Sequence, residues 1–371
     1  MKRGAFGVVV ALLVAAGLVF TAVNLFKKDP EQSVVKITGV IGSEKGPFFA
    51  DPEVKAALAK RGLEVSVQSA GSWQMNDVRK GSADFVFPAS QLPADEIAQQ
   101  NQLNGTPPRP FYSPLVIVTH LDVAGVLKEN NLAKKSESGV WTFSMDEFLK
   151  AVSANRTWEQ LNAAERPKAL AGDIFLTTTN PDTSSSGTLY VAMLAYLLNN
   201  HQVVTDQATV GSIGPALKAA VTKQGIMKSS TEEPFLDFVS GNGRPLVLAY
   251  ESQALDLVMK KTAPEDMVVL YPDTTITSDH TLVGFTDNGR KLGEALADDA
   301  RLRELEVKYG FRPLGGVAGA EAFTKQVQSV NAAQSNPKFA FATDLQAANV
   351  NKATVPTAEI MKSLVQAAKK Q

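Results

Sequence analysis

A run of hydroxyl-bearing residues near the middle of this 371-residue sequence is well suited to hold a small ligand. The run consists of Thr183, Ser184, Ser185 and Ser186, and Gly187 follows it directly. It precedes an apolar stretch, Leu189 to Leu198, whose spacing predicts a buried helix. The N-terminus of a helix leaves backbone N–H groups unpaired and carries a positive partial charge, so we expect it to bind a small anion or a carboxylate. Gly187 would let the ligand approach the backbone closely, although a plain N-cap also favours Ser, Thr and Asp.

Small polar residues also follow each of three expected strands in the first part of the chain. The strands are expected at residues 34–40, 63–68 and 83–87. In open α/β sheets, ligands bind in the loops beyond the carboxyl ends of the strands. Trp73 is expected either to cover a ligand or to be buried in the core. The residues of these loops that we predict to bind the ligand are Ser43, Glu44, Ser72, Trp73 and Ser90.

Tyr250 and Glu251 occupy a comparable junction between a strand and a helix farther along the chain. Glu251 is suited to receive a ligand amine or a hydrogen-bond donor from the other lobe. An acidic residue in the first turn of a helix also stabilises the helix by itself, so a purely structural role is the alternative. Carboxylates in a cleft repel a bare multivalent anion unless donors offset them. A zwitterion, a neutral polar solute or a cation therefore stays open as the ligand.

The sequence lacks the common signatures of catalysis and of metal binding. His120, His201 and His280 are far apart and lack the His-x-x-x-His spacing of a zinc site. Residues 182–187 do not form a Gly-x-Ser-x-Gly elbow, and there is no Gly-x-x-x-x-Gly-Lys phosphate loop. The absence of Cys excludes disulfides, thiolate metal sites and a lipid on an N-terminal Cys. We therefore predict a protein that is not an enzyme and has no catalytic residue, metal or cofactor.

Composition and charge are those of a globular protein that does not bind nucleic acid. Hydrophobic residues make up 44% of the chain and charged residues 20%, which disfavours disorder. The formal net charge is −1, and without the four basic residues among residues 1–28 the rest of the chain carries −5. Lys and Arg are mixed with Asp and Glu along the expected helices, so the sequence predicts no basic surface for nucleic acid.

An uncharged, mostly apolar run of 23 residues, from Gly4 to Phe26, lies between basic residues at the start of the chain. At ~1.5 Å per residue, this run would cross a hydrocarbon layer ~30 Å thick. We expect residues 1–30 to form one transmembrane anchor in the cell membrane, with the main body on the extracytoplasmic side. A cleavable signal peptide is the alternative, and it would leave a secreted or periplasmic protein.

Beyond residue 30, short β-branched runs alternate with amphipathic stretches, which predicts an α/β fold with a mainly parallel sheet. Among the expected elements are helices at residues 52–60, 73–80 and 157–161 and a strand at residues 174–178. A Pro-rich linker at residues 106–110 indicates a crossing between two lobes, and Pro272 with Asp273 indicates the return. We predict a discontinuous lobe 1 of residues 31–115 and 275–371, and a lobe 2 of residues 116–274.

Between Val34 and Pro313 the chain resembles bacterial extracellular solute-binding proteins of the type 2 periplasmic-binding fold. The resemblance rests on five stretches: residues 42–44, 181–188, 250–252, 271–273 with Asp279 and His280, and 310–313. It implies two lobes joined by a hinge that close on a ligand held by loops of both. The contact residues that it implies are Ser43, Ser72, Ser90, Ser185, Ser186 and Tyr250.

The apparent anchor departs from the soluble or lipidated members of that family. It resembles the solute-binding modules associated with von Willebrand factor A proteins, and so implies such a protein or an ABC permease as a partner. Our leading hypothesis is a receptor that closes on a small polar or anionic ligand for transport or sensing. The alternatives are a membrane-anchored interaction module without a ligand and an exported hydrolase that uses carboxylates.

Overall fold

The computed structural model describes residues 34–167, 170–334 and 338–369. The expected anchor or signal segment, residues 1–30, lies outside these ranges. Within them, no helix is both long enough and apolar enough to cross a bilayer.

The first sheet has the strand order β11-β3-β1-β2. Its strands are β1 (Val35–Ile41), β2 (Leu63–Ser69), β3 (Phe85–Phe87) and β11 (Val283–Gly284). The first three are parallel to one another, whereas β11 runs antiparallel to β3. Parallel neighbours need crossover connections. The one from β1 to β2 contains α2 (Gly46–Ala50) and α3 (Pro52–Lys60), the one from β2 to β3 contains a 3₁₀ turn, and α4 (Gln91–Gln100) follows β3. The carboxyl ends of β1, β2 and β3 therefore lie together, as expected.

The second sheet is built around the long strand β4 (Phe111–His120). The start of β4 pairs with β10 (Thr277–His280) and β12 (Arg312–Pro313), and its end pairs with β7 (Val247–Tyr250) and β8 (Met267–Pro272). The sheet continues through β6 (Trp141–Phe143) to β5 (Ala133–Lys135). A separate short pair joins β9 (Thr274–Thr275) to β13 (Asn351–Lys352). The chain thus leaves the first sheet through β4 and returns to it through β9 and β10.

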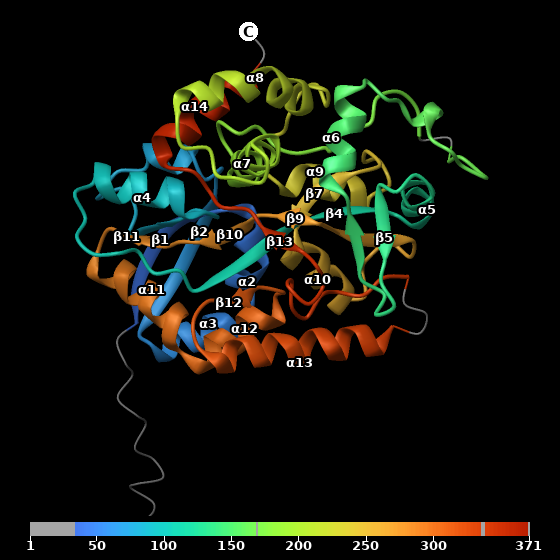
Figure 1. Ribbon diagram of the computed structural model, residues 1–371. Coiled ribbons are helices and arrows are strands. Elements are labelled where there is room, and N and C mark those ends of the chain that lie inside the picture. The colour runs from blue at the N-terminus through green and yellow to red at the C-terminus, as the bar shows by residue number, and fades with distance from the viewer. Residues whose placement is uncertain (1–33, 168–169, 335–337, 370–371) are drawn as a thin grey trace, which may run out of the picture.

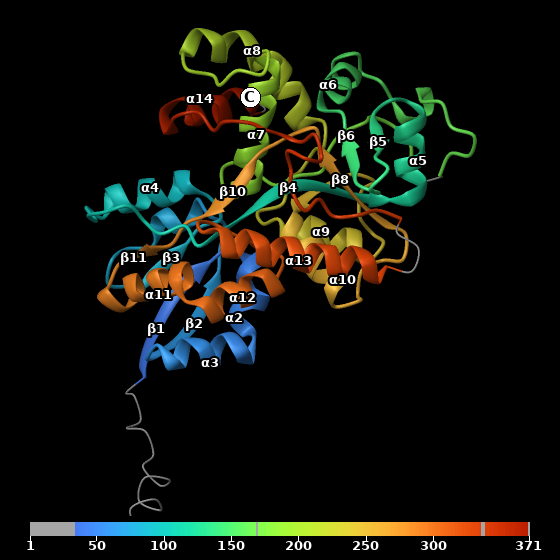
Figure 2. The same cartoon turned by 60° about the horizontal axis from the view of Figure 1, so that its bottom comes forward.

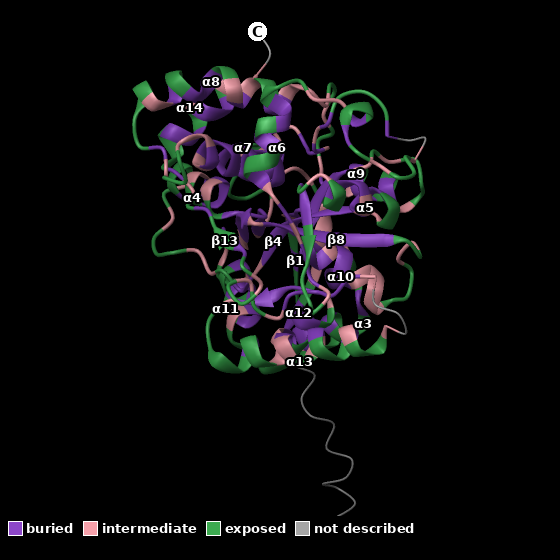
Figure 3. Ribbon diagram, turned by 45° about the vertical axis from the view of Figure 1, so that its right-hand side comes forward, coloured by how far each residue is buried: buried purple, intermediate pink, exposed green. Residues whose placement is uncertain are grey.

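Helices cover both sheets, as Figures 1 and 2 show from two directions. Near the first sheet lie α11 (Asp287–Asp298) and α12 (Ala300–Lys308). The second core contains the almost completely buried α7 (Ser185–Leu198). The purple interior of Figure 3 marks these buried elements. The other helices are α5 (Leu121–Glu129), α6 (Met145–Ser153), α8 (Gln207–Thr222), α9 (Glu232–Val239), α10 (Glu251–Met259), α13 (Val317–Ala333) and α14 (Ala358–Ala368).

Helix α14, near the end of the chain, packs against α7 and α8 and adds Ile360 and Leu364 to their core. In Figures 1 and 2 it lies beside α8, far from β1 and β2. We had grouped residues 275–371 with lobe 1, so this contact places a late segment beside elements of the predicted lobe 2. Helix α14 is amphipathic, and such a helix buries its apolar face on any apolar helix surface within reach, regardless of its position in the sequence.

Three elements differ from the sequence prediction. The expected strand at residues 174–178 is reduced to isolated bridges, because Thr177 alone of those residues aligns with β7. The helix expected at residues 73–80 is a short 3₁₀ turn, Gln74–Asp77, that ends where the chain becomes extended at Val78. The helix expected at residues 157–161 is likewise a 3₁₀ turn, Trp158–Gln160.

Candidate functional site

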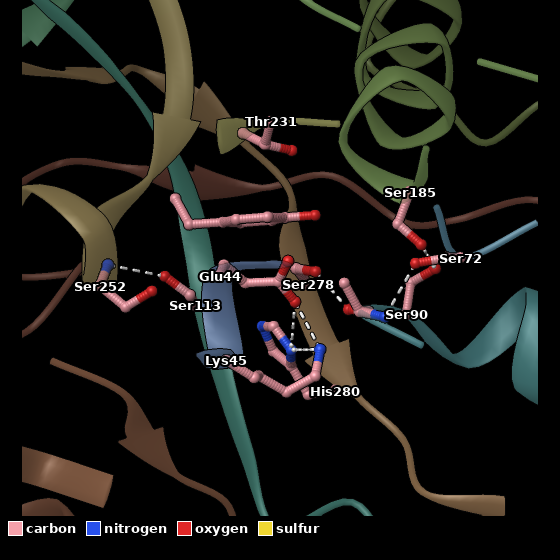
Figure 4. A network of polar contacts seen from close by, with 12 residues as sticks. Glu44, Lys45, Ser72, Ser90, Ser113, Ser185, Thr231, Ser252, Ser278 and His280 are labelled. Carbon is pink, nitrogen blue, oxygen red and sulfur yellow. Dashed lines mark hydrogen bonds and ion pairs between the residues drawn. The ribbon is translucent and has the colours of Figure 1, made fainter. Parts of the chain in front are cut away.

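A network of polar side chains joins the loops of the first sheet to the N-terminus of α7 (Figure 4). Ser90 precedes α4, and its Oγ lies 2.7 Å from Oγ of Ser185 in the first turn of α7. Ser72 Oγ accepts a hydrogen bond of 3.0 Å from the backbone N–H of Ala89. All three serines are buried. The predicted residues Ser72, Ser90 and Ser185 are therefore brought together although they are far apart in the sequence.

The remaining hydroxyls of the run pair with one another beneath the start of α7. Ser186 Oγ lies 2.7 Å from Thr179 Oγ1, 2.6 Å from Thr231 Oγ1 and 3.1 Å from Ser184 Oγ. Thr183 donates to backbone carbonyl oxygens, including that of Asn180. Ser184 makes no side-chain cap hydrogen bond, so the hydroxyls here exceed what an N-cap requires.

Two close backbone contacts pack the loop at residues 71–73 and the start of α7 against the turn at residues 179–183. A Cβ on Gly187 would lie 2.4 Å from the carbonyl oxygen of Thr179, and a Cβ on Gly71 would lie 2.4 Å from that of Thr183. Trp73 donates from its indole N–H to Thr188 at 2.6 Å and is partly buried. The chain itself therefore makes the close approach that we expected of a ligand at Gly187.

The other end of the network is an acid, an amine and an imidazole packed away from solvent. Lys45 Nζ donates to the Glu44 carboxylate and to Nδ1 of His280, the latter at 3.1 Å. Lys45 and His280 are completely buried, and the Glu44 side chain is 5% exposed. Burial, together with the Lys45 charge, holds the pKa of His280 well below its usual range. The imidazole is therefore neutral. Its Nδ1 lies 3.1 Å from Lys45 Nζ and 3.4 Å from Glu44 Oε1, and its Nε2 has no partner among the described residues.

Tyr250 connects the two ends of the network. It is buried at the end of β7. Burial raises the pKa of its phenol, and the Glu44 charge raises that pKa further. Hydrogen bonding with Ser278, Thr231 and Ser186 acts in the opposite direction. The phenol is thus placed between the hydroxyls near α7 and the carboxylate of Glu44, in its neutral form.

Glu251 faces away from this network. Arg312 donates from Nε to Glu251 Oε2 at 2.6 Å and from Nη2 to Oε1 at 2.8 Å. The Tyr271 hydroxyl also donates to the Glu251 carboxylate. Both oxygens of this buried carboxylate therefore have protein donors. A structural role explains Glu251 without a ligand.

Sequence reasoning missed several members of the network. Lys45 directly follows Glu44, and His280 had been noted only among the scattered histidines and in the family resemblance. The other members come from separate segments whose local sequence carries no binding signal. The residues missed are Lys45, Thr179, Thr231, Ser278 and His280.

Cavities border the network at both ends. One, of about 400 Å³, is lined by residues that include Ser90, Leu189 and Asp279. The other, of about 200 Å³, is lined by residues that include Ser43 and Glu44. In the described ranges, no group of three His, Asp or Glu side chains is placed to hold a metal ion.

Comparisons with known proteins agree with this geometry. The sequence pattern that defines the bacterial extracellular solute-binding protein family matches residues 52–312. The sulfate-binding protein SubI from Mycobacterium tuberculosis H37Rv is 18% identical, with a TM-score of 0.52 over 78% of this chain and 91% of its own. The binding protein AfuA from Actinobacillus pleuropneumoniae, with fructose-6-phosphate bound, is 11% identical, with a TM-score of 0.56 over 89% of this chain and 96% of its own. A periplasmic thiamin-binding protein is 12% identical, with a TM-score of 0.54 over 91% of this chain and 97% of its own.

No curated protein sequence matches the chain. The likenesses to solved structures, at identities below 20%, establish the fold, an α/β architecture of the periplasmic-binding type. The family pattern covers well over half of the chain, so the predicted family is confirmed. The protein belongs to the bacterial extracellular solute-binding proteins, which bind solutes outside the cytoplasm and do not convert them.

Proposed function

We propose that this protein is an extracytoplasmic receptor that closes two lobes on a small polar ligand, held between the start of α7 and the loop after β1. The observation that carries the proposal is the contact of 2.7 Å between Ser90 and Ser185. It joins a strand-end loop of the first sheet to the helix N-terminus of the second core. Both groups are of the kind that binds polar solutes.

The chemistry of hydroxyl groups supports reversible closure. A hydroxyl donates one hydrogen bond and accepts two. Ser90 and Ser185 can therefore each replace their mutual contact with a hydrogen bond to a ligand oxygen or nitrogen. An exchanged hydrogen bond changes the free energy by only ~0.5–1.5 kcal/mol, whereas an unpaired buried hydroxyl is costly. Ligand atoms that satisfy these groups would therefore favour the closed arrangement over the open one.

The lobes themselves are part of the proposal. We assign residues 31–115 to lobe 1 and residues 116–274 to lobe 2, with the hinge at the crossings near Pro114 and Pro272. The late segment 275–371 was grouped with lobe 1, and β10, β11 and α11 support this for its first part. The packing of α14 on α7 and α8 supports moving the last helix to lobe 2.

The membrane and partner assignments rest on the sequence. We propose that residues 1–30 anchor the receptor in the cell membrane, because their apolar run is long enough to span it. An ABC permease is the partner if the receptor serves transport, and a von Willebrand factor A protein if it serves sensing. The structural relatives bind sulfate, thiamin or fructose-6-phosphate, and these small polar solutes are compatible with the cavities described above.

Native mass spectrometry and a thermal-shift panel test the proposal. The protein, as an exporting host delivers it, is measured with oxyanions, sugars, amino acids and amines. A co-purified small molecule or a selective rise in melting temperature supports the receptor. A clean apo mass with no shift by any compound contradicts it and favours an interaction module.

A double variant tests the network directly. Ser185→Ala with Ser186→Ala is expected to weaken the binding of the solute that the panel identifies by at least tenfold, because two hydroxyl partners are lost. The control is Ser136→Ala with Ser138→Ala, which removes another pair of hydroxyls in mutual contact at 2.8 Å on the exposed surface. An unchanged dissociation constant in the first variant, measured by calorimetry, would exclude these serines from the site.

A further inference from the structure

We propose that the ligand carries a positively charged amine, and that this amine enters an acidic pocket between the loop after β1 and helices α9 and α10. The inference rests on the proposed receptor function and names the chemical class of its ligand. It departs from the anion that the helix N-terminus of α7 by itself suggests.

The acidic pocket is defined by three carboxylates from three elements. Glu44 comes from the loop after β1, Glu232 from the first turn of α9 and Asp256 from α10. The cavity measures about 200 Å³, and its lining contains no Lys, Arg or His. The lining also includes the aromatic side chains of Phe235 and Tyr309. Carboxylates beside aromatic rings are the environment that favours an organic cation.

Glu232 is the carboxylate that lacks a counter-ion. Glu44 is paired with Lys45, and Asp256 is paired with Lys260 at 2.7 Å. Glu232 forms no ion pair with any residue that the structure describes. Partial burial and the nearby charge of Glu44 both raise the pKa of Glu232. A ligand ammonium beside Glu232 would supply the missing positive charge.

An unsatisfied hydroxyl in the same lining, that of Ser252, points independently to a ligand. Ser252 is only 2% exposed, and its Oγ has no hydrogen-bond partner among the described residues. Ser43, in the same lining, hydrogen-bonds with the Glu232 carboxylate, which partly offsets the rise in the pKa of Glu232. Figure 4 places Ser252 beyond Glu44, at the end of the network away from Ser90 and Ser185. Buried hydroxyls are rarely left unpaired, and an ammonium donates to hydroxyl oxygens as well as to carboxylates.

The protein already places an ammonium at one edge of this pocket. Nζ of Lys260 contacts Asp256 and lies 5.1 Å from the centre of the Tyr309 ring. That arrangement combines a carboxylate with an aromatic ring, as we propose for the ligand. The free carboxylate of Glu232 and the hydroxyl of Ser252 leave room for a second ammonium in the same cavity.

The competing ligand classes fit this pocket less well. An anion would meet three carboxylates and no basic side chain in the lining. A single metal ion would need several carboxylates around one point, and no three acidic or His side chains in the described residues are so placed. An amine needs only one carboxylate and a few acceptors, which Glu232 and Ser252 provide.

Isothermal titration calorimetry with 1,4-diaminobutane tests the proposal on the protein as an exporting host delivers it. Two probes of similar length are the controls: neutral 1,4-butanediol and anionic succinate. We expect the diamine to bind with a dissociation constant below 1 mM, on the order of a weak small-ligand affinity, and the controls not to bind. Raising the salt concentration from 50 to 500 mM is expected to weaken the binding, because charge pairing is screened.

Matched variants on one helix turn identify the carboxylate. Glu232→Gln keeps the size of the side chain and is expected to weaken diamine binding at least tenfold. Glu233→Gln, next to it but exposed and outside the lining, is expected to leave the affinity unchanged. Equal melting temperatures for both variants and the parent exclude a folding defect. Equal weakening in both variants, or none in either, overturns the assignment to this pocket.

The outcomes separate this inference from the receptor function. Binding of succinate or of another solute in the panel, without the diamine, overturns the amine and leaves the receptor intact. Binding of no compound, with no change in melting temperature, overturns both. Diamine binding that depends on Glu232 supports both.

Discussion

The buried ion pair between Glu251 and Arg312 allows a structural role to be separated from a ligand-binding role. The Glu251 side chain is 0% exposed and that of Arg312 6%. Glu251→Gln keeps the shape but leaves the guanidinium buried without its counter-ion. Removing one partner of such a pair costs about 3–5 kcal/mol. Arg312 retains the carbonyl oxygens of Ala342 and Thr343 as acceptors, so we expect a loss near the lower end, about 3 kcal/mol in the free energy of unfolding.

Urea unfolding followed by circular dichroism at pH 7 measures this loss. The control is Glu304→Gln, whose exposed carboxylate pairs with Arg301 at 2.8 Å and is expected to contribute less than about 1 kcal/mol. Because Glu251 faces away from the polar network, solute affinity measured by calorimetry should change less than about twofold in folded Glu251→Gln, well under the ~1.4 kcal/mol of a tenfold change. A stability loss below about 1 kcal/mol, accompanied by loss of solute binding, would refute this reasoning.

Two further substitutions test packing and buried charge. Gly187→Ala should lower the free energy of unfolding by about 1–3 kcal/mol because its Cβ would clash with the Thr179 carbonyl. The control Gly211→Ala lies in open space on α8 and should be neutral or slightly stabilising. Equal effects of the two substitutions in urea unfolding would contradict the clash. Burial raises the pKa of Glu306 well above its usual range, and both its oxygens lack partners among the described residues. The folded state therefore keeps a proton that the unfolded state releases, so this residue makes stability fall as pH rises above the ordinary Glu range. Glu306→Met should remove that component and stabilise the protein at pH 7 by about 1 kcal/mol or more, and an unchanged slope of stability between pH 5 and 8 would count against it.

Local sequence signals were sufficient to predict a helix or strand whose ends are set by residues within or next to it. The helix predicted at residues 52–60 is confirmed as α3, because Asp51 caps it with a hydrogen bond from Glu53 N–H and Pro52 fits the first helical position. The predicted start of α7 near Ser185 is confirmed for a similar reason: the polar run changes abruptly to apolar residues. The parallel first sheet followed from alternation of strands and helices, which needs crossovers.

Other elements contradict their own local signals. Helix α8 contains Pro215 as well as Gly211 and Gly214, residues that normally end or weaken a helix, and we did not predict it. Its apolar face packs on α7 and α14, and tertiary packing offsets the poor propensity. The position of α14 could likewise not be predicted, because an amphipathic pattern does not indicate which elements the helix packs against.

The candidate site divides in the same way. Serines at strand ends and at a helix N-terminus are recognisable from the sequence because strand-end loops are where such folds bind ligands. The contact of Lys45 with His280 joins residues 235 positions apart, and no local pattern signals such a pairing. Glu251 shows the converse: its position suggested either a ligand amine or a donor from the other lobe, and the structure shows that Arg312, 61 positions away, occupies its carboxylate.

The two kinds of polar contact in this protein differ in how easily they can be exchanged. Glu251 and Arg312 are buried charges whose separation leaves an uncompensated ion, so this contact suits a junction that stays closed. Ser90 and Ser185 are neutral groups, and each can accept a new partner without leaving a charge unpaired. Reversible closure requires exchangeable hydroxyl contacts where the lobes separate, whereas regions that stay packed tolerate a buried ion pair. On the proposed lobe assignment, the hydroxyl network lies where the receptor must open. The buried ion pair instead ties α10 of lobe 2 to β12, which pairs with the start of β4 near the proposed hinge, where the lobes stay joined.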